Sequence, residues 1–175
     1  MTASTATYGS GFKTTQNAFT RTGYTFIGWN EKQDGSGTTW DKSTSGTYEN
    51  GTDWTWTYTN SITLYAIWEQ YSYTITYNPG EGTGTTTTSS HAYNDSSKLT
   101  DISTLGFSLS GYSFNGWATS SGGAVVYANA ATAPYTLVTS DGSNINLYAI
   151  YTQNTPWTLT QIKLYDATNG KWWTI

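Results

Sequence analysis

Histidine is the side chain best suited to acid–base catalysis near neutral pH, and His91 is the only histidine in the chain. Any Ser–His or His–carboxylate arrangement would therefore depend on this residue. His91 lies in a run rich in Thr and Ser, 87–93, whose composition favours a β-strand. The sequence predicts a partly exposed strand residue there and not a catalytic base.

Carboxylates are the other source of chemistry, because a pair of them can hydrolyse a glycosidic bond. Most of the acidic residues lie in turn-forming sequence, where a solvated role is expected. With no cysteine, one histidine and no calcium-loop motif, the chain is expected to have no catalytic residue, no cofactor and no metal site, and not to be an enzyme. The eleven acidic residues are Glu31, Asp34, Asp41, Glu49, Asp53, Glu69, Glu81, Asp95, Asp101, Asp141 and Asp166.

The overall composition indicates a β protein with an aromatic core. Of the 175 residues, 10% are charged and 17% are aromatic, and the formal net charge is −4. The seven Lys and Arg form no cluster that could neutralise a run of phosphates, so nucleic-acid binding is not expected. No apolar run reaches the roughly 20 residues that cross a bilayer, so membrane insertion is not expected either.

Two separated motifs occur twice in the same order, which indicates a tandem duplication. The run TGYTFIGW at 22–29 returns as SGYSFNGW at 110–117, and ITLYAIW at 62–68 returns as INLYAIY at 145–151. Their β-branched and aromatic residues predict strands. The aromatic residues that recur are expected to form two similar cores.

The duplication divides the chain into two small β domains, 1–70 and 71–153, and a C-terminal β-hairpin, 154–175. A short helical turn is expected only at 96–102 and at its counterpart, 13–18. The predicted fold class is therefore mostly β with minimal helix.

The two copies differ at their beginnings. The second copy opens with an alternating strand, YTITY at 73–77, which precedes the Thr- and Ser-rich strand at 87–93. The first copy matches only the later strand, so it lacks an opening strand. A sheet without that strand exposes an edge, and we expect the region 2–8 to contact another chain or another copy. The predicted edge strand comprises Thr5, Ala6, Thr7 and Tyr8.

An aromatic stripe in the first copy is the best candidate for an interaction surface. Alternate residues of a strand share a face, so Trp54, Trp56 and Tyr58 are expected to point the same way. The second copy is far less aromatic at this place. Three interpretations are open: a protein interface, a platform for sugar rings, and closure of the first repeat's core.

The C-terminal hairpin is predicted to consist of a strand at 157–165, a turn at 166–170 and a closing strand at 171–175. Because an isolated hairpin is marginal in water, we expect it to pack on the second repeat or on another molecule. Trp172 and Trp173 are its candidate interaction residues.

With G-Y-x-F-x-G-W followed by L-Y-A-x-W in the first copy and a close variant in the second, the chain resembles the Listeria–Bacteroides repeat, also called the internalin B-repeat. The likeness covers about residues 5–152, with Leu109 in place of the family's Arg and Tyr151 in place of its final Trp. It implies a β-grasp-like module, a short sheet against a short helix, without known catalytic residues.

The family is found in bacterial surface proteins and in some phage proteins, so the resemblance implies an extracellular or virion location. The chain shows no signal peptide and no wall anchor, and its end is weakly similar to those of phage tail and fibre proteins. We therefore expect a structural phage component (decoration, fibre or tail-associated) that binds other protein chains, either itself or virion proteins. The alternative is a carbohydrate-binding or spacer module of a bacterial surface adhesin, with glycans as ligands.

Overall fold

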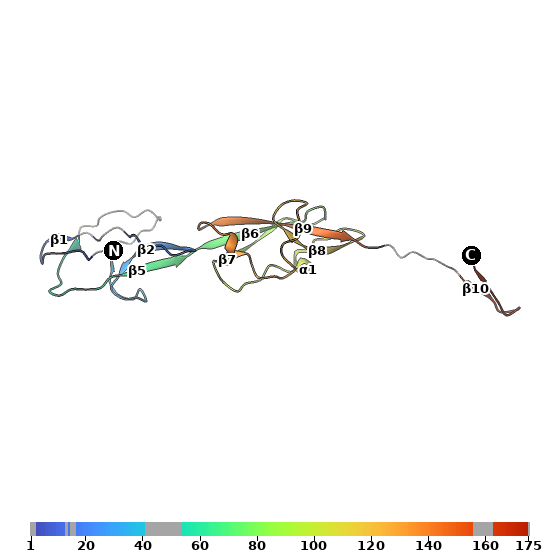
Figure 1. The fold of residues 1–175 in the computed structure, drawn as a ribbon, viewed down its shortest axis with the longest axis horizontal. Helices are drawn as coiled ribbons and strands as arrows, with labels where there is room; N and C mark the ends of the chain where they lie inside the picture. Colours follow the sequence, from blue (N-terminus) through green and yellow to red (C-terminus); the bar gives the residue numbers. More distant parts are fainter. Residues whose placement is uncertain (1–2, 13, 15–16, 41–53, 156–162, 175) are drawn as a thin grey trace.

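The computed structural model describes residues 3–12, 14, 17–40, 54–155 and 163–174. Figure 1 shows two β lobes that follow one another along the long axis, and a separate C-terminal hairpin. The fold is mostly β, as predicted. In chain order the elements are β1 (Gly11–Phe12), β2 (Tyr24–Asn30), β3 (Thr39–Trp40), β4 (Trp54–Thr55), β5 (Tyr65–Gln70), β6 (Ser72–Asn78), β7 (Thr87–Ala92), α1 (Ile102–Leu105), β8 (Tyr112–Ala118), the 3₁₀ helix η1 (Tyr135–Leu137), β9 (Ser143–Gln153), β10 (Lys163–Asp166) and β11 (Lys171–Thr174).

The second repeat is built on a four-stranded sheet in the order β7-β6-β9-β8. The first and last strands of the unit, β6 and β9, are parallel neighbours at its centre, and β7 and β8 pair with them antiparallel at the edges. The helix α1 lies between β7 and β8 in the chain. This is the β-grasp arrangement that the family resemblance implied.

The alternating pattern of β6 creates the core of the second repeat. Tyr73, Ile75 and Tyr77 point inward and are 2%, 0% and 0% exposed. Alternate strand residues face one side of a sheet, so the YTITY pattern predicted both the strand and its buried face. The residues buried with them are Leu99, Phe107, Trp117, Ala133, Val138, Ile145, Leu147 and Ala149.

The helix begins later than the sequence predicted, at Ile102 and not within 96–101. The Asp101 side chain accepts a hydrogen bond from the Ser103 backbone N–H, which caps the first turn. Gly106 ends the helix in a left-handed conformation. Of the second expected helical turn, 13–18, residues 14, 17 and 18 are not helical, and the rest lie outside the described residues.

The first repeat has a smaller sheet, in the order β3-β2-β5, and a short separate pair, β1 with β4. Its β2–β5 ladder reproduces the β8–β9 ladder, including a bulge between Phe26 and Gly28 that corresponds to the one between Phe114 and Gly116. Both bulge glycines have a positive φ, 145° and 148°. The two repeats thus share one backbone framework, as the duplicated motifs predicted.

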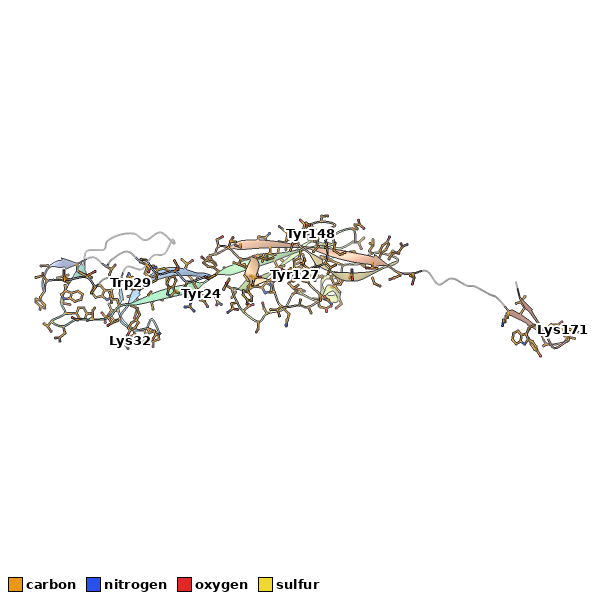
Figure 2. The ribbon with its side chains drawn as sticks, in the orientation of Figure 1. Tyr24, Trp29, Lys32, Tyr127, Tyr148 and Lys171 are labelled. Carbon is orange, nitrogen blue, oxygen red and sulfur yellow. The ribbon has the colours of Figure 1, made fainter. Side chains whose placement is uncertain are left out.

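Not all of the recurring aromatic residues belong to the cores. Trp29, labelled in Figure 2, and its counterpart Trp117 are 6% and 0% exposed, as predicted, but Tyr65 and Tyr112 are 39% and 38% exposed. For these two tyrosines the prediction is wrong, because each lies at one end of its strand, where little packs over the ring.

No described residue of the first repeat takes the place that β6 has in the second. Accordingly β5 starts only at Tyr65, whereas β9 starts at Ser143 and pairs along its first half with β6. Residues 62–64, the first part of the strand predicted at 62–68, are not in a strand. The predicted edge strand Thr5, Ala6, Thr7 and Tyr8 is also wrong: residues 3–7 are irregular and Tyr8 is in a turn. Among the described residues, no strand lies between these two segments.

The C-terminal hairpin has the predicted form where it is described. Its strands β10 and β11 pair antiparallel, with Leu164 opposite Trp173. Residues 157–162 and Ile175 lie outside the described residues. The Tyr165 and Trp172 rings lie 4.8 Å apart and remain 53% and 67% exposed, so the hairpin does not bury them against the second repeat.

Candidate interaction site

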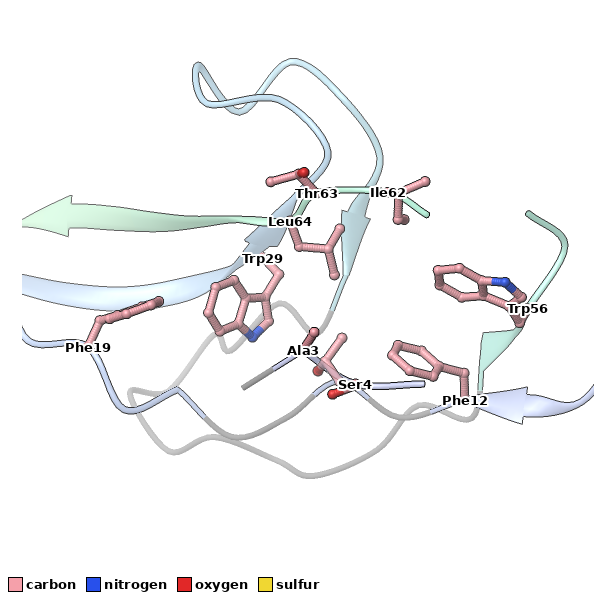
Figure 3. Close-up of a pocket in the computed structure, with 10 residues that line it drawn as sticks. Ala3, Ser4, Phe12, Phe19, Trp29, Trp56, Ile62, Thr63 and Leu64 are labelled. Carbon is pink, nitrogen blue, oxygen red and sulfur yellow. The ribbon is translucent and has the colours of Figure 1, made fainter. Parts of the chain in front are cut away.

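A groove runs through the first repeat, between its N-terminal segment and the residues that precede β5 (Figure 3). Its volume is about 400 Å³. The lining is largely apolar and aromatic, which suits a peptide or an apolar side chain better than an ion. The groove residues are Ala3, Ser4, Phe12, Thr14, Phe19, Trp29, Trp56, Ile62, Thr63 and Leu64.

The aromatic packing beside the groove is the same in both repeats. Phe19 meets Trp29 edge-on with ring centroids 6.1 Å apart, and Phe107 meets Trp117 in the same way at 6.3 Å. Both tryptophans lie in equivalent strands, β2 and β8. The aromatic pair that lines the groove is therefore equivalent to a pair that lies in the core of the second repeat.

The comparison of equivalent positions shows what the groove is. Five core residues of the second repeat surround the side chains of β6, and their counterparts in the first repeat all line the groove. In order, Leu99, Phe107, Trp117, Ile145 and Leu147 correspond to Thr14, Phe19, Trp29, Ile62 and Leu64. In the second repeat Tyr77 fills this space, with its ring centroid 5.1 Å from that of Trp117. The groove thus corresponds to the space that the inward side chains of β6 occupy in the second repeat.

Two residues of the predicted aromatic stripe, Trp56 and Tyr58, lie in this region. The prediction that one strand carries the stripe is wrong, because β4 ends at Thr55 and residues 56–58 are irregular. The rings of Trp56 and Tyr58 lie 5.2 Å apart, and each is 5.9 Å from buried Trp40. Phe12 completes the group, 5.1 Å from Trp56. Trp56 and Tyr58 are half-buried, so they both pack on the first repeat and face the groove region. Trp54 lies in β4 opposite Phe12.

A carboxylate ties this aromatic group to the sheet. Glu31 accepts hydrogen bonds from the Tyr58 hydroxyl and from the Trp40 indole, the latter at 3.1 Å. The hydrogen bond from Tyr58 is the main reason that the pKa of Glu31 lies below its usual value. The sequence analysis expected most acidic residues to be solvated in turns and did not predict this role for Glu31.

A second hollow, about 580 Å³ in volume, adjoins the groove. It brings Thr5, Ala6 and Tyr8 of the predicted edge together with Trp56 and Tyr58 of the predicted stripe. The structure thus unites two sets of residues that the sequence suggested separately. Trp172 and Trp173 belong to the hairpin and are not part of this site.

His91 is buried, with 8% of its surface exposed, so the prediction of a partly exposed residue is wrong. Its ring stacks on Tyr73 at 5.4 Å, because His91 faces the same side of the sheet as the core of β6. Its two ring nitrogens lie 2.6 Å from the hydroxyl oxygens of Ser89 and Ser97, and Ser97 donates to Asp95. Burial lowers the pKa of His91, which favours the neutral ring. This chain of hydrogen bonds fastens β7 to the loop that follows it.

Several acidic residues have the turn role that the sequence predicted. Asp34, Asp101 and Asp166 each accept a hydrogen bond from the backbone N–H two residues later. Among the described residues there is no group of three or more His, Cys, Asp or Glu that could hold a metal ion. None of the described helices is long and apolar enough to span a membrane.

Sequence reasoning missed the groove itself, although a signal was present. The absence of a match to 73–77 implied not only a free edge but also an uncovered core. Aligning the core residues of the second copy with the first would have pointed to Phe19, Ile62 and Leu64. The contribution of Phe12 had no such signal, because its counterpart is not aromatic.

These features define a tandem array of two small β-grasp modules, of which the first is open where the second is closed. The sequence pattern of the Listeria-Bacteroides repeat domain matches residues 1–67 and 73–150, and the chain belongs to this family. No curated protein and no solved structure matches the chain significantly. The family is typical of extracellular and surface proteins, and this chain is a repeat module of that kind.

Proposed function

We propose that the chain is a non-enzymatic structural protein of a phage particle, as a decoration, fibre or tail-associated component, and that it acts by binding other protein chains. The groove of the first repeat carries this proposal. The same space in the second repeat is filled by a strand of protein, β6. A site with that shape and lining is suited to an extended polypeptide.

Exposed aromatic residues near both ends of the chain support a role in assembly. Tyr8 is 66% exposed and Trp172 is 67% exposed. Trp and Tyr are enriched among the residues that dominate protein–protein binding. With few charges on its surface, the chain is suited to packed contacts with neighbouring subunits.

A second function is favoured by one feature, the hollow next to the groove. Tyr8, Trp56 and Tyr58 line it together with Asn60. Aromatic faces and an amide are the groups that recognise a sugar ring, so the alternative is a glycan-binding or spacer module of a bacterial surface adhesin.

Two measurements on the full chain separate these functions. Light scattering over a concentration series tests assembly, for which a discrete increase in mass is expected. A titration of tryptophan fluorescence with soluble glycans tests the alternative, with Trp56→Ala as the site variant and Trp172→Ala as the control. A monomer whose fluorescence responds to a glycan, and loses the response only in Trp56→Ala, would overturn the proposed function.

A further inference from the structure

We propose that the groove of the first repeat binds residues 157–161 of a second copy of the chain, which then serve as its opening strand, so that copies join head to tail. This inference rests on the proposed assembly function and specifies its interface. The occupant, its orientation and its contacts follow from the second repeat, where the equivalent strand is present.

The chemistry of the occupant is defined by β6. Its inward residues are Tyr73, Ile75 and Tyr77, separated by two threonines. The run WTLTQ at 157–161 repeats the first four positions of this order, namely an aromatic residue, Thr, an aliphatic residue and Thr again, and has Gln161 in the place of Tyr77. It also follows the last strand of the second repeat much as β6 follows the last strand of the first.

The register follows from the pairing in the second repeat. There β6 runs parallel to β9, with Ile75 opposite Ile145. The counterpart of Ile145 is Ile62, which lines the groove and is only half-buried. Leu159, in the place of Ile75, would therefore lie opposite Ile62 and cover it.

A chain cannot fill its own groove. Figure 1 shows that β9 ends at the side of the second repeat away from the first. Residues 154–156 span at most roughly 11 Å when fully extended, whereas the eleven-residue β9 alone is about 35 Å long. The strand must therefore come from a second copy.

The junction between the two repeats supplies an independent argument. Tyr93 of the second repeat covers Gly23 of the first so closely that a Cβ at Gly23 would lie 2.1 Å from its ring. The Tyr93 N–H donates to the Tyr71 carbonyl at 2.8 Å, and the Gln70 side chain donates to the Tyr93 carbonyl. Tyr24 meets the ring edge-on.

The counterparts of the two residues at this junction, Gly111 and Tyr8, lie at opposite ends of the two-repeat unit and do not contact each other within one chain. At Gly111, the counterpart of Gly23, no described residue apart from its chain neighbours has an atom within 4 Å of where the Cβ would lie. Tyr8, the counterpart of Tyr93, is 66% exposed. Gly9 and Asn94, the residues that follow these tyrosines, both have a positive φ, which supports the correspondence.

The hydrogen bond that accompanies the junction at Gly23 has an equivalent at Gly111 in the second repeat. The Asn154 N–H donates to the Gly111 carbonyl at 2.9 Å, as the Tyr71 N–H donates to the Gly23 carbonyl at 2.9 Å. Insertion of residues 157–161 into a second copy would place Tyr8 of that copy on Gly111. One contact thus fills the groove and completes the junction. Because the two surfaces differ, the association is heterologous and forms rings or filaments.

The test uses two full-length variants that each disable one surface. Leu159→Asp prevents the donor strand from inserting, since a carboxylate cannot enter the apolar groove. Leu64→Asp disables the groove. Thr158→Asp is the matched control, because it adds the same charge on the opposite face of the strand. Thermal unfolding followed by circular dichroism verifies that each variant remains folded.

The expected masses are specific. The unmodified chain and Thr158→Asp form species larger than two copies, and each of the other variants alone is a monomer. An equimolar mixture of Leu159→Asp and Leu64→Asp forms a dimer and nothing larger, because one intact donor meets one intact groove.

Two results would overturn the inference. If Leu159→Asp associates as well as the unmodified chain, the interface lies elsewhere and assembly itself stands. If the unmodified chain is monomeric and a peptide of residues 155–162 fails to bind it, the groove does not accept this strand, although binding to other virion proteins remains as the proposed function.

Discussion

Phe19 and Phe107 occupy the same position in the two repeats, yet Phe19 is 49% exposed and Phe107 is 6% exposed. Each meets an equivalent tryptophan edge-on, so the local packing does not explain the difference. What differs is the strand β6 of the second repeat, which has no counterpart among the described residues of the first. The greater exposure of Phe19 is therefore attributed to a strand that no described residue of the first repeat supplies.

This difference predicts unequal effects of the same substitution. Phe107→Ala leaves a cavity in a closed core and is expected to cost about 3–5 kcal/mol of unfolding free energy. Phe19→Ala removes a half-exposed ring and is expected to cost roughly 1–2 kcal/mol. Urea unfolding of both variants at low protein concentration measures the two values. Equal losses would contradict the view that the first repeat is open.

A pair of glycines predicts a second contrast. Gly23 and Gly111 both have a φ of 78°, so alanine at either position pays about 1 kcal/mol for the left-handed conformation. Only at Gly23 would the new methyl group also displace the Tyr93 ring. Gly23→Ala is therefore expected to lower the melting temperature more than Gly111→Ala does. In addition, Gly111→Ala should weaken head-to-tail association, which light scattering detects.

The buried histidine predicts a pH dependence of stability. Burial lowers the pKa of His91 in the folded chain, and neighbouring Asp95 opposes this only in part. The unfolded chain therefore takes up the proton first, near pH 6.5, and stability falls as the pH drops from there through the lowered pKa. Between pH 7.5 and 5 the melting temperature of the unmodified chain should fall more than that of His91→Gln. Parallel curves would exclude this role for His91.

A buried amide holds the hairpin turn of the first repeat. Asn30 is 1% exposed; its side chain donates to the carbonyls of Gly35 and Gly37 and accepts from the N–H groups of Lys32 and Gly37. Asn30→Ala leaves these groups without that partner and is expected to cost about 1–3 kcal/mol. As a control, Asn169→Ala in the exposed C-terminal hairpin should change stability by less than about 0.5 kcal/mol. Chemical denaturation compares the two.

Features that repeat were predictable from the sequence, because each copy supports the interpretation of the other. The strands around Trp29 and Trp117 and the inward face of β6 follow from alternation and duplication. The start of α1 could not be predicted from the sequence. Both Asp95 and Asp101, six residues apart, can accept a hydrogen bond from the backbone N–H two residues later, so either could begin a helical turn. The burial of His91 depends on the stacked Tyr73 ring across the sheet, a contact that strand propensity does not contain.

Contacts between strands, which propensity does not contain, also explain why the strands predicted in the first repeat are partly wrong. Residues 5–8 and 62–64 have strand-like composition, but a strand forms only where a neighbouring strand pairs with it, and no described strand pairs with either segment. Strand propensity alone therefore does not predict the groove, whereas a comparison of the two repeats does.

The parallel pairing of β6 with β9 has a mechanical consequence. The chain enters the second repeat at one end of β6 and leaves it at the opposite end of β9, so tension along the chain shears all the hydrogen bonds of the pair at once. The described part of the first repeat contains no parallel strand pair, so this repeat, when pulled alone, should yield at a lower force. Once a neighbouring subunit supplies the strand, every module along a filament would bear load equally, and single-molecule stretching would resolve one force level in place of two.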